Sequence, residues 1–160
     1  MKKLTIGFDI TIYPSIDDLP QELGMLMVSA VKALPKSYAP YSEFYVAAAG
    51  LMANGEIISG ANFENASYPL TLCAERVVLA SAAAQFPGMH LNTMAITAKN
   101  RGKILEKPIP PCGACRQVLV EMEYKNRENI RLVLGGETGE IYVIDKASQL
   151  LPLGFDGDFF

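Results

Sequence analysis

Apolar residues alternate with polar residues near the start of the chain and then recur at helical spacing. Residues 4–12 carry an apolar side chain at every second position, which predicts a half-buried strand at the edge of the main sheet. Over residues 17–33, apolar side chains recur every three or four positions. This spacing predicts an amphipathic helix that Ser15 or Asp17 could cap and that Pro35 ends.

Strand and helix patterns alternate along the rest of the chain. Asn54-Gly55 predicts a tight hairpin between two strands, and residues 64–71 are expected to form a loop. The predicted elements are strands at 44–52, 56–62, 91–98, 131–135 and 140–144, and helices at 72–85, 112–124 and 146–151. This order predicts one α/β domain over residues 1–160, with a mostly mixed sheet and helices on its faces.

Composition and charge exclude several classes of function. Half of the 160 residues are apolar, and the formal net charge is −3 with no run of Lys or Arg. Proteins that bind duplex nucleic acid usually carry a basic stripe, so a small neutral ligand is the better expectation. The sequence contains no uninterrupted stretch of about eighteen apolar residues, so no membrane span is predicted. Asp9 interrupts the apolar residues near the start of the chain, which argues against a signal peptide. The protein is therefore expected to be cytoplasmic.

Three cysteines carry the first chemical signal. Cys112 and Cys115 are two residues apart, so one helix-opening turn can present both sulfurs to one ion. Cys73 falls at the start of another predicted helix, where the helix dipole favours the thiolate that ligates metals. A single buried cysteine is usually core packing, but three at these positions predict a Zn²⁺ site.

Glu75 indicates what such a site would do. Three sulfur ligands leave one tetrahedral position free, which is typical of catalytic zinc because structural sites are usually closed by four protein ligands. Glu75 lies two residues after Cys73, so it is expected near the ion without binding it. A carboxylate there can move protons between an activated water, a ring nitrogen and a departing amine. This is the arrangement of the zinc deaminases, which include a three-cysteine variant.

Two arginines close to these cysteines in the sequence bear on the same ion. Three thiolates and Zn²⁺ carry a combined charge of −1, which weakens the ability of the ion to acidify water. A guanidinium that donates a hydrogen bond to sulfur would restore part of that ability and orient the ligand. We therefore expect Arg76 and Arg116 to support the cysteine ligands.

Four segments together make the sequence similar to the small homotetrameric cytidine deaminases. They are residues 38–42 (YAPYS), 60–68 (GANFENASY), 73–76 (CAER) and 111–117 (PCGACRQ). The resemblance spans roughly residues 18–155. It implies a three-layer α/β/α fold with a mixed sheet of about five strands. Residues 1–16, with a possible extra edge strand, and the tail 156–160 extend beyond the usual core.

The resemblance also implies roles for residues around the metal. Asn62 and Glu64 would hydrogen-bond the ribose hydroxyls, Phe44 would line the base pocket, and the backbone at Ala74 would meet the base carbonyl. Other matching residues would contact the site of a neighbouring subunit, and these are Ala66, Tyr68 and Phe155. Such shared sites imply a homotetramer whose assembly is needed for activity.

The expected reaction is hydrolytic deamination of cytidine or deoxycytidine to the uridine product and ammonia, in pyrimidine salvage. One alternative is the deamination of a cytosine-containing antibiotic such as blasticidin S, which Phe63 keeps open because family members often have a smaller residue there. Another is a zinc-stabilised module that binds a nucleoside without turning it over. The retained Glu75 argues against the second alternative.

Overall fold

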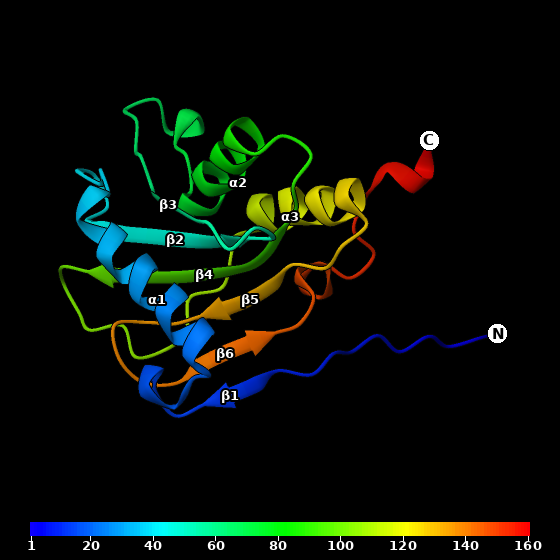
Figure 1. Ribbon diagram of the computed structural model, residues 1–160, viewed down its shortest axis with the longest axis horizontal. Coiled ribbons are helices and arrows are strands. Elements are labelled where there is room, and N and C mark those ends of the chain that lie inside the picture. The colour runs from blue at the N-terminus through cyan, green and yellow to red at the C-terminus, as the bar shows by residue number, and fades with distance from the viewer.

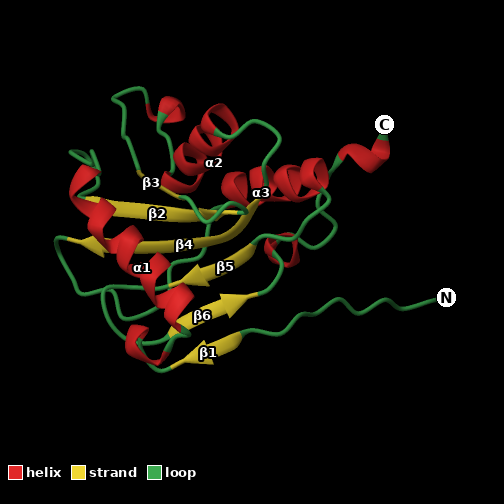
Figure 2. Ribbon diagram, viewed as in Figure 1, coloured by secondary structure: helices red, strands yellow, loops and turns green.

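The computed structural model describes residues 1–160 and arranges them as a six-stranded sheet between two layers of helices (Figures 1 and 2). The order of the strands across the sheet is β1-β6-β5-β4-β2-β3. The strands are β1 Thr11–Tyr13, β2 Phe44–Met52, β3 Ile57–Ala61, β4 Leu91–Asn100, β5 Arg131–Leu134 and β6 Ile141–Ile144. The helices are α1 Gln21–Ala33, α2 Ala74–Gln85 and α3 Gly113–Asn126. None of them combines the length and the apolar character that crossing a membrane requires.

Alternate residues of the same strands form the two faces of the sheet. Met94 and Ile96 of β4 pack with α2 and α3, whereas Ala95 between them packs with α1 on the opposite face. Successive side chains of a strand point to opposite faces, so one apolar run supplies both cores. The helix α1 thus forms one outer layer, and α2 with α3 form the other. The expected three-layer α/β/α class is confirmed.

Strand direction brings the starts of α2 and α3 to the same end of the sheet. Strands β3 and β4 both pair antiparallel with β2, so they run the same way, and β4 pairs parallel with β5. The helix α2 connects β3 to β4, and α3 connects β4 to β5. Both helices therefore begin near the carboxyl ends of the strands that precede them, which is where open α/β sheets bind ligands.

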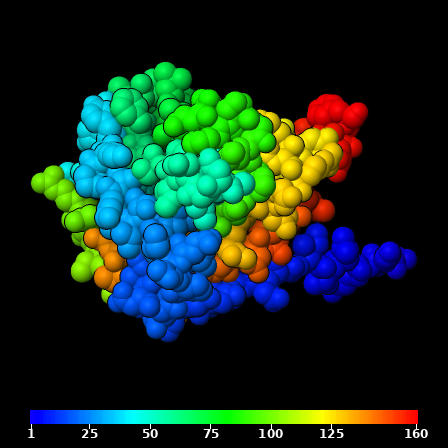
Figure 3. Space-filling view, viewed as in Figure 1, coloured from blue at the N-terminus to red at the C-terminus, as the bar shows by residue number.

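The N-terminal strand is much shorter than predicted. Strand β1 pairs with β6 only over Thr11–Tyr13. Phe8 still packs against the core, and the first few residues extend away from the body of the molecule (Figures 1 and 3). Continuing the register would bring Asp9 opposite Asp145, and like charges in that position destabilise an antiparallel pair. The extra edge strand is confirmed, but the prediction of a strand over residues 4–12 is wrong before Thr11.

Two predicted helices also differ from the structure. Ser15 caps a short 3-10 helix at Ile16–Asp18, and α1 begins only after Pro20. The residue before a proline is disfavoured in helical conformation, and Leu19 is extended with a ψ angle of 147°. The helix predicted at 146–151 is a 3-10 helix at Ala147–Leu150.

A buried carboxylate joins α3 to the segment that follows β6. Glu123 is only 7% exposed, and its two oxygens accept hydrogen bonds from three backbone amides. The donors are Ile130 at 2.8 Å, Ala147 at 2.9 Å and Ser148 at 3.1 Å. This carboxylate therefore fixes both the start of β5 and the 3-10 helix after β6.

We expect Glu123→Ala to lower the free energy of unfolding by about 3 kcal/mol, because buried amides would lose their acceptor. Urea denaturation of the two proteins measures this difference. The matched control is Glu121→Ala, since Glu121 is exposed on the same helix, and its effect should stay within about 0.5 kcal/mol. Equal losses in the two variants would contradict the role of Glu123.

Candidate active site

The three cysteine sulfurs lie together at the N-termini of α2 and α3. Cys73 immediately precedes α2, Cys112 immediately precedes α3, and Cys115 lies in the first turn of α3. The Sγ atoms of Cys73 and Cys112 are 3.8 Å apart, and those of Cys112 and Cys115 are 3.5 Å apart. All three sulfurs lie within 4.8 Å of one another. Residues 39 positions apart in the sequence thus meet at one point.

These separations fit a zinc ion. Ligands at the usual Zn–S distance of about 2.3 Å, placed on a tetrahedron, have sulfurs roughly 3.8 Å apart. No fourth His, Cys, Asp or Glu belongs to the group. The expectation that Cys73, Cys112 and Cys115 could hold a metal ion is confirmed, and a three-sulfur set leaves a coordination position for water or substrate.

The site stabilises negative charge on sulfur. Cys73 and Cys112 each occupy the position before a helix, where the helix dipole favours a thiolate. The contact with the Cys115 side chain lowers the pKa of Cys73 to about 6. The same contact, together with burial, raises the pKa of Cys115. The cluster therefore favours at least one thiolate at neutral pH.

Glu75 is buried beside the cysteines. It lies in the first turn of α2 and is 4% exposed. Burial raises the pKa of its carboxyl group above the ordinary value. A raised pKa brings a carboxyl group closer to the range in which it can both accept and release a proton. Glu75 is therefore a candidate for proton transfer beside the three cysteines.

A cavity of about 440 Å³ is lined by two of the cysteines and by residues at the start of β2. Its wall includes six of the residues that the sequence singled out, and these are Cys73, Cys112, Glu75, Phe44, Asn62 and Glu64. The remaining wall residues were not predicted, and they are Ser42, Val46, Thr71, Leu72, Ile109 and Pro110. Ser42 lies in the YAPYS segment, and Ile109 and Pro110 closely precede Cys112. Their closeness to these motifs in the sequence is the signal that could have placed them in the site.

Hydrogen bonds fix the side chain of Asn62 beside the start of β2. Its side-chain oxygen accepts hydrogen bonds from the Ser37 hydroxyl and from the backbone amide of Val46 at 2.9 Å. Its side-chain nitrogen donates to the backbone carbonyl of Phe44 at 3.0 Å. An amide nitrogen carries two N–H groups, so one remains to donate to a ligand in the cavity.

Glu64 is oriented by the turn that precedes β2. Its carboxylate accepts hydrogen bonds from the backbone amides of Tyr41 at 2.9 Å and Ser42 at 3.3 Å, and from the Ser42 hydroxyl. Burial raises the pKa of Glu64, but these hydrogen bonds outweigh it and hold the pKa below the ordinary value. The lowered pKa favours an ionised Glu64, which places a hydrogen-bond acceptor in the cavity wall.

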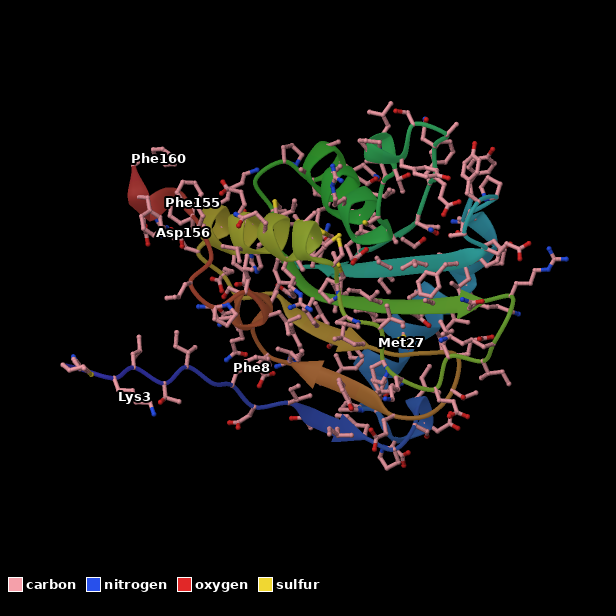
Figure 4. The ribbon with its side chains drawn as sticks, turned by 180° about the vertical axis from the view of Figure 1, so that it is seen from behind. Lys3, Phe8, Met27, Phe155, Asp156 and Phe160 are labelled. Atoms are coloured by element: carbon pink, nitrogen blue, oxygen red, sulfur yellow. The ribbon has the colours of Figure 1, made fainter.

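Four of the predicted substrate-contact residues lie outside the cavity wall. Ala74 is fully buried at the start of α2, where its side chain can contact only the protein core. Tyr68 and Phe155 are 70% and 56% exposed, and Ala66 is also exposed. Figure 4 shows Phe155 beside Phe160 at the free end of the chain. Within one chain, these three exposed residues do not meet the cysteine group.

The two predicted arginines have different surroundings. The Arg116 guanidinium donates from Nε to the Pro111 carbonyl and from Nη1 to the Leu150 carbonyl, both at 2.9 Å. Its hydrogen-bond partners are backbone carbonyls and not sulfur, and its support of the cysteine ligands stays a prediction. Arg76 contributes, after the Cys115 contact, to the lowered pKa of Cys73, which agrees with a place close to that ligand.

The fold and the donor set together define a zinc-dependent deaminase of the type that acts on nucleobases. The chain belongs to the family of the cytidine and deoxycytidylate deaminase zinc-binding region, whose model matches residues 20–127. A cytidine deaminase of Halalkalibacterium halodurans is 41% identical over 134 residues, which are 84% of this chain and 94% of the relative.

Solved structures agree with this membership. The crystal structure of a cytidine deaminase from Burkholderia pseudomallei matches with a TM-score of 0.70 and 41% identity, covering 82% of this chain and 97% of that one. A cytidine deaminase from Mycobacterium leprae matches with a TM-score of 0.62 and 35% identity, over 81% and 97% of the two chains.

Proposed function

We propose that this protein hydrolyses cytidine and deoxycytidine to uridine and deoxyuridine with release of ammonia, in pyrimidine salvage. One observation carries the proposal. A buried glutamate, two of the three clustered cysteines and two oriented polar side chains, Asn62 and Glu64, share one cavity of about 440 Å³. A nucleoside needs all three, because its base must be attacked while its sugar is held.

Some of these residues act on the base of the nucleoside, and others bind its sugar. Cys73, Cys112 and Cys115 would hold zinc, which would supply the Lewis acidity that makes water a better nucleophile at neutral pH. Glu75 takes one proton from the attacking water and delivers it to N3 of the pyrimidine. It then takes the second proton from the new hydroxyl group on C4 and delivers it to the amine, so that ammonia leaves and C4 keeps a carbonyl oxygen. Asn62 donates to a ribose hydroxyl and Glu64 accepts from one. The free backbone N–H of Ala74, at the start of α2, suits the base carbonyl.

The cavity favours a nucleoside over its 5′-monophosphate. Its wall contains the carboxyl groups of Glu64 and Glu75 and no Lys or Arg, and a phosphate needs a cation or several N–H donors. We expect kcat/KM for cytidine or deoxycytidine to exceed that for deoxycytidine 5′-monophosphate by at least about 100-fold, as the loss of a charged partner implies. The ultraviolet change on deamination measures all three rates with zinc-loaded protein.

The same assay separates the alternatives. Turnover of the monophosphate at the nucleoside rate would contradict the nucleoside preference, and turnover of blasticidin S alone would establish the antibiotic deaminase. No turnover of any of them by zinc-replete protein would favour the binding module.

The exposed residues support an assembly of several copies. By resemblance, Ala66, Tyr68 and Phe155 belong at the site of a neighbouring subunit, and in this chain all three lie outside the cavity and are exposed. We infer a homotetramer on this basis. Light scattering in solution gives its mass, and a monomer that is fully active would contradict the inference. The cytoplasmic location stays a prediction from the sequence.

A further inference from the structure

One side chain of α3 joins two separate parts of the chain. Arg116, which is half-buried, donates to the carbonyl of Pro111, the residue directly before Cys112. Its Nη1 atom donates to the carbonyl of Leu150, which lies 34 positions after Arg116 in the sequence. Both hydrogen bonds are 2.9 Å long. The planar guanidinium has donors that point in several fixed directions, so a single arginine can hold two carbonyls at once.

The residue after Arg116 strengthens the connection to the same part of the chain. The side-chain nitrogen of Gln117 donates to the carbonyl of Phe155 at 2.6 Å. Leu150 also packs against the core beneath α2 and α3, and Gly154 lies against Val120 of α3. The C-terminal segment, residues 150–155, is therefore held along the helix that carries Cys115. The metal-binding turn, residues 111–115, lies at the start of that helix.

We propose that Arg116 is a positioning residue that couples the metal-binding turn to the C-terminal segment. It restrains the Pro111 carbonyl and so the backbone that presents Cys112 and Cys115 to the ion. Through Leu150 it also fixes the base of the segment that ends in Phe155. The inference rests on the proposed zinc site, and it gives Arg116 a role that depends on geometry and not on contact with sulfur.

Zinc release measures this role directly. We expect Arg116→Gln to lose zinc to a coloured chelator about tenfold faster than the unaltered chain, the size of effect seen when a partner of a metal ligand is removed. Arg116→Lys should release zinc comparably fast, because an ammonium keeps the charge but cannot hold both carbonyls. Release from Arg116→Lys at the unaltered rate would assign the effect to charge and overturn the proposal.

Two controls separate positioning from general effects. Arg131→Gln removes an equal charge from an exposed ion pair with Asp145, and Leu26→Ala destabilises the core on the other face of the sheet. Both should release zinc within about twofold of the unaltered rate, as distant independent sites do. Rapid release from Leu26→Ala would attribute the effect to stability and contradict the proposal.

Amide hydrogen exchange in the C-terminal segment, residues 150–155, tests the same coupling from the other side. If the two parts are coupled, removing zinc should speed amide hydrogen exchange in residues 150–155 of the unaltered chain. In Arg116→Gln, exchange there should already be fast and should not respond to zinc. Equal exchange with and without zinc in the unaltered chain would overturn the coupling. A chain that binds no zinc at all would instead contradict the proposed function.

Discussion

Glu75→Gln is expected to lower kcat for cytidine deamination by at least about a thousandfold while the protein keeps its zinc. General acid–base groups contribute roughly a hundred- to ten-thousandfold to catalysis, and Glu75 is proposed to move a proton more than once in the cycle. Glutamine has nearly the same shape as glutamate, so the buried position should remain filled. The residues that could hold the ion are the three cysteines, so the loss of this carboxylate should leave zinc binding unchanged.

The measurement combines turnover with metal content. Initial rates with cytidine are compared at saturating substrate, and zinc per chain is determined by atomic absorption on the same samples. Glu56→Gln is the matched control, since Glu56 is exposed at the β2–β3 turn, and it should retain the unaltered rate. A zinc-replete Glu75→Gln that still turned over cytidine within tenfold of the unaltered rate would refute the assignment of Glu75.

Local sequence patterns were sufficient to predict most of the strands and helices. The alternation around Ala95 and the Asn54-Gly55 turn are set by neighbours within a few residues, so the strands β2, β3 and β4 could be predicted closely. The end of β1 could not, because it depends on Asp145, a residue far along the chain that would face Asp9. The apolar alternation over residues 4–10 indicates a segment that could form a strand, but the segment pairs with no strand of this chain.

The candidate site shows the same division. The spacing of Cys112 and Cys115 and the place of Glu75 after Cys73 are short-range signals, and the structure brings all four residues together. The hydrogen bond from Ser42 to Glu64 spans 22 residues and has no sequence period. The backbone carbonyls that Arg116 contacts could not be predicted for a related reason. Its acceptor Leu150 comes near only once the whole sheet has formed.

Cys115→Ser is expected to lose the bound zinc and at least about a thousandfold in turnover, because the metal supplies the acidity that water lacks at neutral pH. Cys115 is fully buried, and its Sγ atom lies 3.5 Å from that of Cys112. A serine hydroxyl is a poor zinc ligand, since it stays protonated where a thiol gives a thiolate. The two remaining sulfurs cannot complete a site that already has one open position.

Thiol reactivity reports on this prediction independently of activity. The chain has three cysteines and all three belong to the metal group, so a thiol reagent reads the site without background. Zinc-loaded protein should react slowly, and adding a chelator should expose all its thiols. Cys115→Ser should react fast with or without the chelator, whereas Ala114→Ser, at the exposed neighbouring position, should behave like the unaltered chain. Slow, chelator-sensitive reaction in Cys115→Ser would mean that two sulfurs suffice to hold the ion, and the proposed three-sulfur site would have to be abandoned.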